Sequence, residues 1–253
     1  MAVASEKLQA GLLRGPPAYR PRTPWSAGAA LAAGVLIVGA GLLAGILVLG
    51  PATAPQGQEW PWRQDLSALA TLGLWQLATV VLTLAASALA GGRVADVLAL
   101  RAPAGEPAVY AKALLLMVVL QLLLGIVQFG LLKEDVYADL RPMMHLFGEQ
   151  WLLALLVVGV GAPLSEELLF RGFLLSALAA SRVGFWGGAV ITSALWTALH
   201  AGYSPAGMVE VFVIGLYFSW LLWRTGSLRV AIVCHALYNS FLVIVLRYVP
   251  LPA

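Results

Sequence analysis

The stretch Pro163-Leu164-Ser165-Glu166-Glu167-Leu168-Leu169-Phe170-Arg171 places two adjacent carboxylates and one arginine inside a run that is otherwise hydrophobic from Trp151 to Ala180. Ionisable groups at membrane depth are costly, so they generally face a cavity and mark a functional site. Glu167 and Arg171 are four residues apart, with the acid on the N-terminal side, which favours an ion pair. Glu166 has Phe170 at that spacing, so we predict that it is the spare carboxylate and can act as a general base. The alternative is a buried ion-pair cluster that only fixes helix packing.

The composition around this stretch is that of an integral membrane protein. The chain has 253 residues, of which 61% are hydrophobic and 11% are charged, and its mean hydropathy is +0.89. Soluble domains carry about a quarter charged residues, so we predict an all-α, polytopic helical bundle in the lipid bilayer. The net charge of +3 is small and the basic residues are dispersed, which argues against a nucleic-acid partner. The single cysteine, Cys234, excludes an internal disulfide and a cysteine-based zinc cluster.

Hydrophobic runs predict about seven transmembrane helices, within a range of six to eight. The predicted spans are residues 27–50, 66–90, 108–132, 151–181, 183–200, 208–223 and 228–246. We divide the chain into a flexible basic N-terminal tail (1–26), N-terminal transmembrane helices without a recognised motif (27–150), a C-terminal core (151–246) and a short C-terminal tail (247–253).

The charges between these spans predict an orientation. Arg182, Arg224 and Arg229 fall at turns on the same side as the basic N-terminus, whereas the acidic loop 133–149 falls on the other side. Because basic loops stay in the cytoplasm, we expect a cytoplasmic N-terminus and a multi-pass protein of the bacterial plasma membrane. The loop 133–149 is expected to hold a short interfacial helix.

Three further polar side chains lie at membrane depth in the C-terminal runs. His200 ends one apolar run, and His235 and Asn239 are four residues apart on the last helix, so they point the same way. At about 1.5 Å per residue from the nearest turn, these three and Glu166 reach a similar depth. A lone histidine on an apolar helix is more often a packing residue, but an acid, two histidines and an amide at one depth predict a site.

This set of side chains suits the hydrolysis of an amide bond. A carboxylate with a nearby histidine can deprotonate a water molecule, and a second histidine and an amide can donate hydrogen bonds to a developing oxyanion. The alternative is zinc, with Glu166, His200 and His235 as ligands and a fourth position open. The zinc-protease pattern HExxH is absent, and Asn239 is a poor zinc ligand. We therefore favour a metal-free water without a cofactor and keep zinc as the alternative.

The same residues resemble the motifs of the CPBP family of intramembrane proteases, which includes the Rce1-type CAAX prenyl endopeptidases and the Abi/bacteriocin-immunity proteins. The family motif EExxxR corresponds to Glu166 through Arg171, and an aromatic residue followed by a histidine corresponds to Trp196 and His200, where the family usually has phenylalanine. A third region resembles Phe212-Val-Ile-Gly215 followed by Arg224-Thr-Gly-Ser-Leu228, and a fourth resembles His235-Ala-Leu-Tyr-Asn239. The likeness covers residues 151–246, which would be the catalytic core.

The resemblance implies an intramembrane endopeptidase with a conical cavity lined by four C-terminal helices. Glu166 and His200 would activate the water, His235 and Asn239 would form the oxyanion hole, and the remaining pair of the first motif, Glu167 and Arg171, would support the helix. The substrate would be a peptide or protein in the membrane, with prenylated CAAX-like proteins among the candidates. The alternative is a non-catalytic immunity protein or chaperone that binds a peptide or lipid in the same cavity. Nothing in the sequence indicates an oligomeric state.

Overall fold

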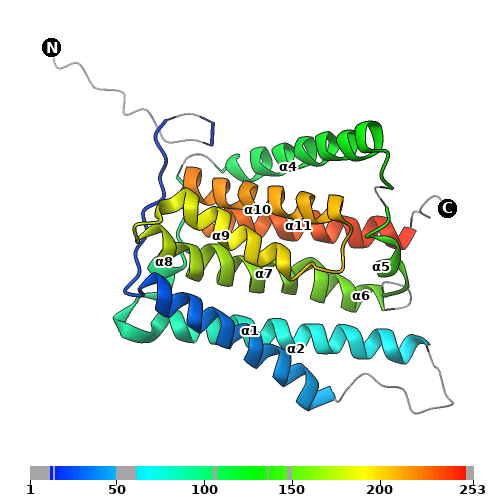
Figure 1. Cartoon of the computed structure of the whole chain (residues 1–253), viewed down its shortest axis with the longest axis horizontal. Helices are drawn as coiled ribbons and strands as arrows, with labels where there is room; N and C mark the ends of the chain where they lie inside the picture. The colour runs from blue at the N-terminus through cyan, green and yellow to red at the C-terminus, as the bar shows by residue number, and fades with distance from the viewer. Residues whose placement is uncertain are drawn as a thin grey trace.

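The structure, a computed structural model, describes residues 12–13, 15–49, 61–104, 107–135, 137–146 and 150–248. All regular elements within these ranges are helical (Figure 1). The α-helices are α1 (Ala27–Leu49), α2 (Pro61–Ala88), α3 (Val94–Val97), α4 (Val109–Gly125), α5 (Arg141–Leu146), α6 (Trp151–Ala154), α7 (Ala162–Glu166), α8 (Leu175–Ala179), α9 (Gly184–Ala198), α10 (Pro205–Thr225) and α11 (Leu228–Tyr248). The segments η2 (Ile126–Leu132), η3 (Leu155–Gly161) and η4 (Glu167–Leu174) are π-helical, and η1 (Leu89–Gly91) is a 3₁₀ turn.

The prediction of an all-α, polytopic bundle is confirmed. Six helical stretches in the described part of the chain are long and apolar enough to cross a membrane. They are Ala27–Leu47, Leu66–Ala88, Val109–Leu132, Trp151–Ala179, Pro205–Thr225 and Leu228–Tyr248. The short α5 lies in the polar loop where we expected an interfacial helix.

The predicted span 183–200 folds as the shorter helix α9. Its 15 residues rise about 22 Å, which is less than the roughly 30 Å of a hydrocarbon core. α9 still carries the chain from the end of the bundle where α8 stops towards the end where α10 begins (Figure 1). For this reason α11 ends opposite the end at which α1 begins.

Two helix starts differ from the prediction. α2 begins at Pro61 rather than at residue 66, and α10 begins at Pro205 rather than at residue 208. Proline suits a first helical position because its fixed φ is helical and the N–H that it lacks would have no partner there. Ser204 caps α10, since its hydroxyl accepts a hydrogen bond from the Gly207 N–H at 3.0 Å.

Part of the segment predicted as a flexible tail packs on the bundle. The Arg224 side chain, at the end of α10, donates to the carbonyls of Leu12 (2.8 Å) and Gly15 (2.9 Å). The Tyr19 N–H donates to the Trp223 carbonyl at 3.2 Å, and the Tyr19 side chain is only 5% exposed. Burial raises the pKa of Tyr19 above its ordinary value. The hydrogen bonds to Arg224 and the burial of Tyr19 therefore hold a segment that its composition alone marks as loose.

The helix from α6 through α8 occupies the centre of the bundle. In Figure 1 it lies between the pair α1–α2 and the pair α10–α11, with α9 beside it. Every residue of η4 is buried, including the charged Glu167 and Arg171. The span Val109–Leu132, by contrast, is only 11% buried, so its side chains mostly face outward, where lipid would lie. The charged motif of the sequence is therefore at the centre of the fold.

Candidate active site

Pro163 shapes the central helix next to the site. Proline has no N–H, so a carbonyl one turn earlier loses its helical donor. α11 supplies substitutes, because the Asn239 Nδ2 donates to the Val158 carbonyl at 3.1 Å and the Ser240 hydroxyl lies 3.5 Å from the Gly159 carbonyl. These carbonyls belong to the π-helical segment η3, and such segments are frequent at functional sites. The irregular helix and α11 are thus joined at Asn239.

Glu167, Arg171 and His235 form a buried charged cluster. The Arg171 Nη1 lies 3.2 Å from the Glu167 Oε1, and both side chains are fully buried. The His235 Nδ1 lies 3.1 Å from the same oxygen. An ionised carboxylate only accepts hydrogen bonds, so the Nδ1 of His235 carries the hydrogen. The sequence predicts the pair of Glu167 with Arg171, but it gives no sign that Glu167 also orients His235.

The rest of the Arg171 side chain packs between aromatic rings and a glycine. Its guanidinium carbon lies 4.3 Å from the centroid of the Trp196 ring, a cation–π contact. At Gly215, an added Cβ would lie 2.8 Å from the Arg171 Nη2 and 2.8 Å from the Ser193 hydroxyl. Gly215, in the third motif, is therefore the residue that leaves room for the arginine.

Glu166 has a different partner from Glu167. The Trp196 Nε1 donates to the Glu166 Oε2 at 2.7 Å, and the Glu166 side chain is half-buried. No ion pair formed within the described ranges includes Glu166. The indole N–H that holds Glu166 would be missing from the phenylalanine that the resembled family usually has at position 196.

His200 follows α9 instead of ending it. Its Nδ1 lies 3.1 Å from the Trp196 carbonyl, which can only accept, so the neutral ring carries its hydrogen on Nδ1 and keeps Nε2 as an acceptor. The ring meets Trp196 edge to face at 5.2 Å and Tyr203 at 5.2 Å between centroids. Its orientation is therefore fixed from two sides.

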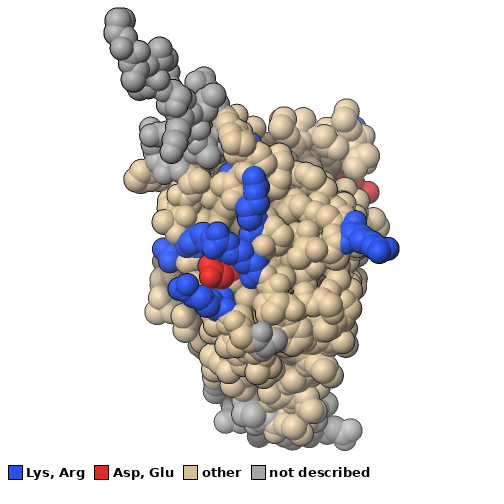
Figure 2. Space-filling model, turned by 90° about the vertical axis from the view of Figure 1, so that its left-hand side faces the viewer, with Lys and Arg blue, Asp and Glu red and all other residues tan. Residues whose placement is uncertain are grey.

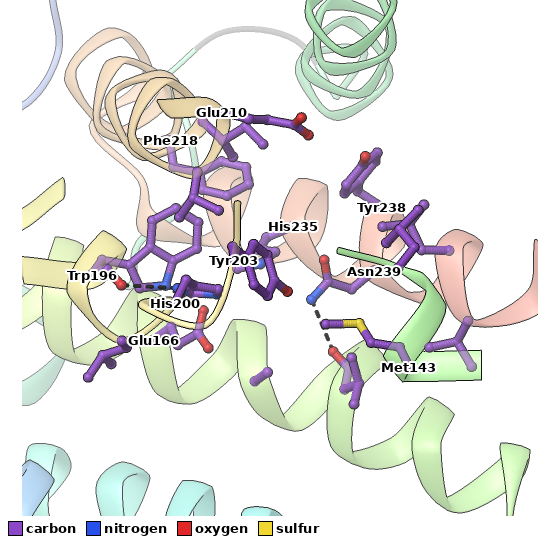
Figure 3. Close-up of a pocket in the computed structure, with 18 of the residues that line it drawn as sticks. Met143, Glu166, Trp196, His200, Tyr203, Glu210, Phe218, His235, Tyr238 and Asn239 are labelled. Atoms are coloured by element: carbon purple, nitrogen blue, oxygen red, sulfur yellow. Dashed lines mark hydrogen bonds between the residues drawn. The ribbon is translucent and has the colours of Figure 1, made fainter. Parts of the chain in front are cut away.

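One cavity of about 320 Å³ brings the predicted site residues together. Glu166 from α7, His200 from the turn after α9, and His235 and Asn239 from α11 all line it (Figure 3). Glu167 and Arg171 are not among its lining residues. The cavity is otherwise mostly apolar, and its further polar lining residues are Gln76, Gln121, Tyr203, Glu210 and Tyr238.

Glu210 and Gln76 are cavity residues that the sequence analysis missed. Gln121 and Gln128 donate to the two oxygens of Glu210 at 3.1 and 2.7 Å. Two signals in the sequence could have revealed this contact. Gln121 and Gln128 are seven residues apart and so share one helix face, and Glu210 is a single acid within an apolar span. Gln76 is 6% exposed, and its Nε2 has no partner among the described residues. It comes from α2, in the part of the chain for which we predicted no site.

The start of α10, next to Tyr203, is held by an acidic residue from the loop before α5. The Ser204 N–H and hydroxyl both donate to the Asp139 carboxylate at 2.8 Å. Burial, and then the negative charges of Glu166 and Asp139, raise the pKa of Tyr203 above its ordinary value. Its phenol therefore stays protonated near neutral pH and can donate a hydrogen bond into the cavity.

The zinc alternative requires three ligands that converge on one point. No group of three His, Cys, Asp or Glu side chains among the residues that the structure describes is placed to hold a metal ion. The Nδ1 atoms of His200 and His235 face the Trp196 carbonyl and the Glu167 carboxylate. These contacts leave the Nε2 atom of each ring free. Because no three ligands converge among the described residues, the proposed mechanism uses no metal, and the zinc alternative stays a prediction for metal analysis.

Comparisons with known proteins match the C-terminal part of the chain. Residues 148–241 match the family model described as type II CAAX prenyl endopeptidase Rce1-like. An uncharacterized 24.3 kDa protein of Escherichia coli is 37% identical over 86 residues, which cover 33% of this chain and 40% of that protein. The UPF0177 protein YxdF of Lactococcus lactis is 26% identical over 85 residues, which cover 34% of this chain and 45% of that protein. The matches thus span less than half of either relative, and no solved structure matches the chain.

The matched residues include every position that the sequence motifs single out, from Glu166 to Asn239. The resemblance read from the motifs is thereby confirmed. Residues 148–241 of this membrane-spanning chain are therefore similar to the family described as type II CAAX prenyl endopeptidase Rce1-like.

Proposed function

We propose that the cavity hydrolyses a peptide bond of a membrane-associated peptide or protein, using a water molecule activated by Glu166 and His200. The observation that carries this proposal is that Glu166, His200, His235 and Asn239, from three separate parts of the chain, line one cavity. A packing role alone would not require these four polar groups to share an opening within an apolar bundle.

Glu166 is the base in this proposal. Its Oε2 accepts the Trp196 N–H, so Oε1 is the oxygen that takes a proton from water. The hydroxide attacks the substrate carbonyl carbon and forms a tetrahedral oxyanion. The C–N bond then breaks, and the proton passes to the leaving amine. His200 presents Nε2 as an acceptor, because its Nδ1 hydrogen is directed to the Trp196 carbonyl, and it can share the transferred proton.

His235 and Asn239 are proposed as donors to the oxyanion. The His235 Nδ1 is already held by Glu167, so its Nε2 can donate only when the ring carries both hydrogens. Asn239 uses one amide hydrogen for the Val158 carbonyl, and an amide carries two, so one remains for the oxyanion.

The test is cleavage by the purified protein in lipid vesicles. Membrane-anchored peptides, with and without a prenyl group, are incubated with the wild-type protein, and the products are identified by mass spectrometry. We expect new termini at an internal peptide bond. Peptides that bind but are never cut would instead support the immunity or chaperone alternative.

Metal analysis of the same active preparation tests the zinc alternative. We expect cleavage to persist after chelation, because Glu166 and His200 activate the water without an ion. About one zinc per chain, with activity lost on chelation and restored by zinc alone, would contradict this proposal.

We also propose that the end of the bundle bearing the N-terminal segment faces the cytoplasm. Figure 2 shows Lys and Arg gathered on this face. Asp96 there lies within 4.0 Å of Arg22, Arg93 and Arg101. The excess of positive charge is what cytoplasmic loops show. Labelling of cysteines introduced at positions 93 and 134 from either side of intact spheroplasts tests the orientation, and access to position 93 from outside would contradict it.

A further inference from the structure

We propose that Glu210 forms a subsite that binds a positively charged side chain, lysine or arginine, of the peptide substrate. This proposal rests on the proposed function above and specifies the substrate class for the same cavity. The subsite consists of Glu210 on α10, Gln121 on α4 and Tyr238 on α11, all of which line the cavity. Figure 3 shows Glu210 and Tyr238 on the side of the cavity away from Glu166.

The Glu210 carboxylate is oriented but not neutralised. The Gln121 Nε2 donates to Oε1 at 3.1 Å and the Gln128 Nε2 to Oε2 at 2.7 Å. Amide donors satisfy hydrogen-bonding capacity without cancelling charge. None of the ion pairs within the described ranges includes Glu210. A carboxylate at membrane depth with only neutral partners attracts a cation.

A second, independent feature of the subsite is a buried acceptor that lacks a hydrogen-bond donor, the Oε1 atom of Gln121. The Nε2 of Gln121 contacts both Glu210 and the Tyr238 hydroxyl, whereas its Oε1 is buried and has no hydrogen-bond partner. Each carboxylate oxygen of Glu210 keeps lone pairs beyond the one that its glutamine uses. An ammonium offers three donors and a guanidinium five, so either can serve Glu210 and the orphaned Gln121 oxygen together.

The balance of charge in the cavity points the same way. The lining includes the carboxylates of Glu166 and Glu210 and no lysine or arginine. Glu167 does not line the cavity and is paired with Arg171, and it is also the contact of His235, the doubly protonated ring proposed as an oxyanion donor. A carboxylate of the substrate at this subsite would meet a like charge in a low-dielectric setting. The aromatic ring of Tyr238, which also lines the subsite, can make a cation–π contact with the bound cation.

The alternative explanation is a clasp, by which we mean that the hydrogen bonds of Glu210 have only the structural role of holding α10 against the helix that carries Gln121. Glutamine amides can bond to one another, so a clasp needs no charge, and an unpaired carboxylate in this position is costly. The charge is therefore explained by a cation that arrives with the substrate.

The experiment compares peptides that differ at one residue. A membrane peptide carries lysine, glutamine or glutamate at each of the four positions on either side of the cleaved bond, and kcat/KM is measured for the reconstituted wild-type protein and for Glu210→Gln. At one position we expect lysine to exceed glutamine by about 10-fold or more in the wild-type protein. In Glu210→Gln this ratio should fall to about 1. Glu134→Gln removes a carboxylate that is exposed outside the cavity and should keep the wild-type ratio.

The outcomes separate this inference from the proposed function. Equal rates for lysine and glutamine at all positions, or a preference that survives Glu210→Gln, would overturn the subsite. A uniform loss of rate for all peptides, with a lower melting temperature, would support the clasp instead. Should the wild-type protein cut no peptide, the proposed function fails, and binding of fluorescent lysine and glutamine peptides then decides whether Glu210 still selects a cation.

Discussion

At the scale of single residues, the two adjacent glutamates have opposite environments. Glu167 is fully buried between Arg171 and His235, whereas Glu166 is half-buried and faces the cavity with Trp196 as its donor. Glu167→Gln should therefore destabilise the protein, because it leaves Arg171 as an uncompensated buried charge, at about 3–5 kcal/mol. Glu166→Gln should leave the melting temperature close to that of the wild-type protein. Thermal unfolding in detergent measures both, and an equal loss in the two variants would contradict the assignment.

Asn239 allows a sharper test of the oxyanion role. Asn239→Ala should lower kcat by about 10²–10³ with little change in KM, as expected when one oxyanion donor is lost. The control is Ser240→Ala, because the Ser240 hydroxyl contacts the neighbouring Gly159 carbonyl of the same helix. An equal loss of kcat in Ser240→Ala would mean that Asn239 acts by holding the irregular helix. A higher KM with unchanged kcat in Asn239→Ala would make Asn239 a substrate-binding residue.

At the scale of elements, α9 and α10 are positioned by the space around Arg171. Gly215→Ala would place a Cβ at 2.8 Å from the Arg171 Nη2 and the Ser193 hydroxyl, so we expect a loss of about 1–3 kcal/mol in stability through overpacking. Gly39→Ala in α1, where an added Cβ meets nothing within 4 Å, is the matched control and should be neutral or slightly stabilising. Thermal unfolding of the two variants checks this, and a stable Gly215→Ala protein would show that α10 can shift without harm.

The elements also show what the sequence can predict. The length of the apolar runs predicts the long helices, because a helix must be long and apolar to span the bilayer. The four-residue spacing of Glu167 and Arg171 predicts their ion pair. The contact of Trp196 with Glu166 and that of His235 with Glu167 could not be predicted, because they depend on how three helices rotate against one another. The length of α9 was overestimated, since an apolar run does not reveal that the helix stops at Ala198.

At the scale of the whole molecule, the part of the chain outside the family match contributes to the site. α2 and α4 supply Gln76 and Gln121 to the cavity wall, although they lie before residue 148, where the match begins. The N-terminal segment in turn packs on the end of α10 through Arg224. Counting residues from the nearest turn predicts that the four C-terminal polar residues lie at one depth in the membrane. The same count cannot identify cavity-lining residues on helices that carry no motif.

In the proposed reaction, Glu166 activates the water that cleaves the substrate. The most direct measurement is the cleavage rate of a membrane peptide by wild-type and Glu166→Gln protein, each folded and reconstituted in the same vesicles, with Glu134→Gln as the control for loss of a carboxylate elsewhere. We predict cleavage by the wild-type protein and by Glu134→Gln, and none above background by Glu166→Gln. Cleavage by Glu166→Gln at the wild-type rate would show that Glu166 is not the base.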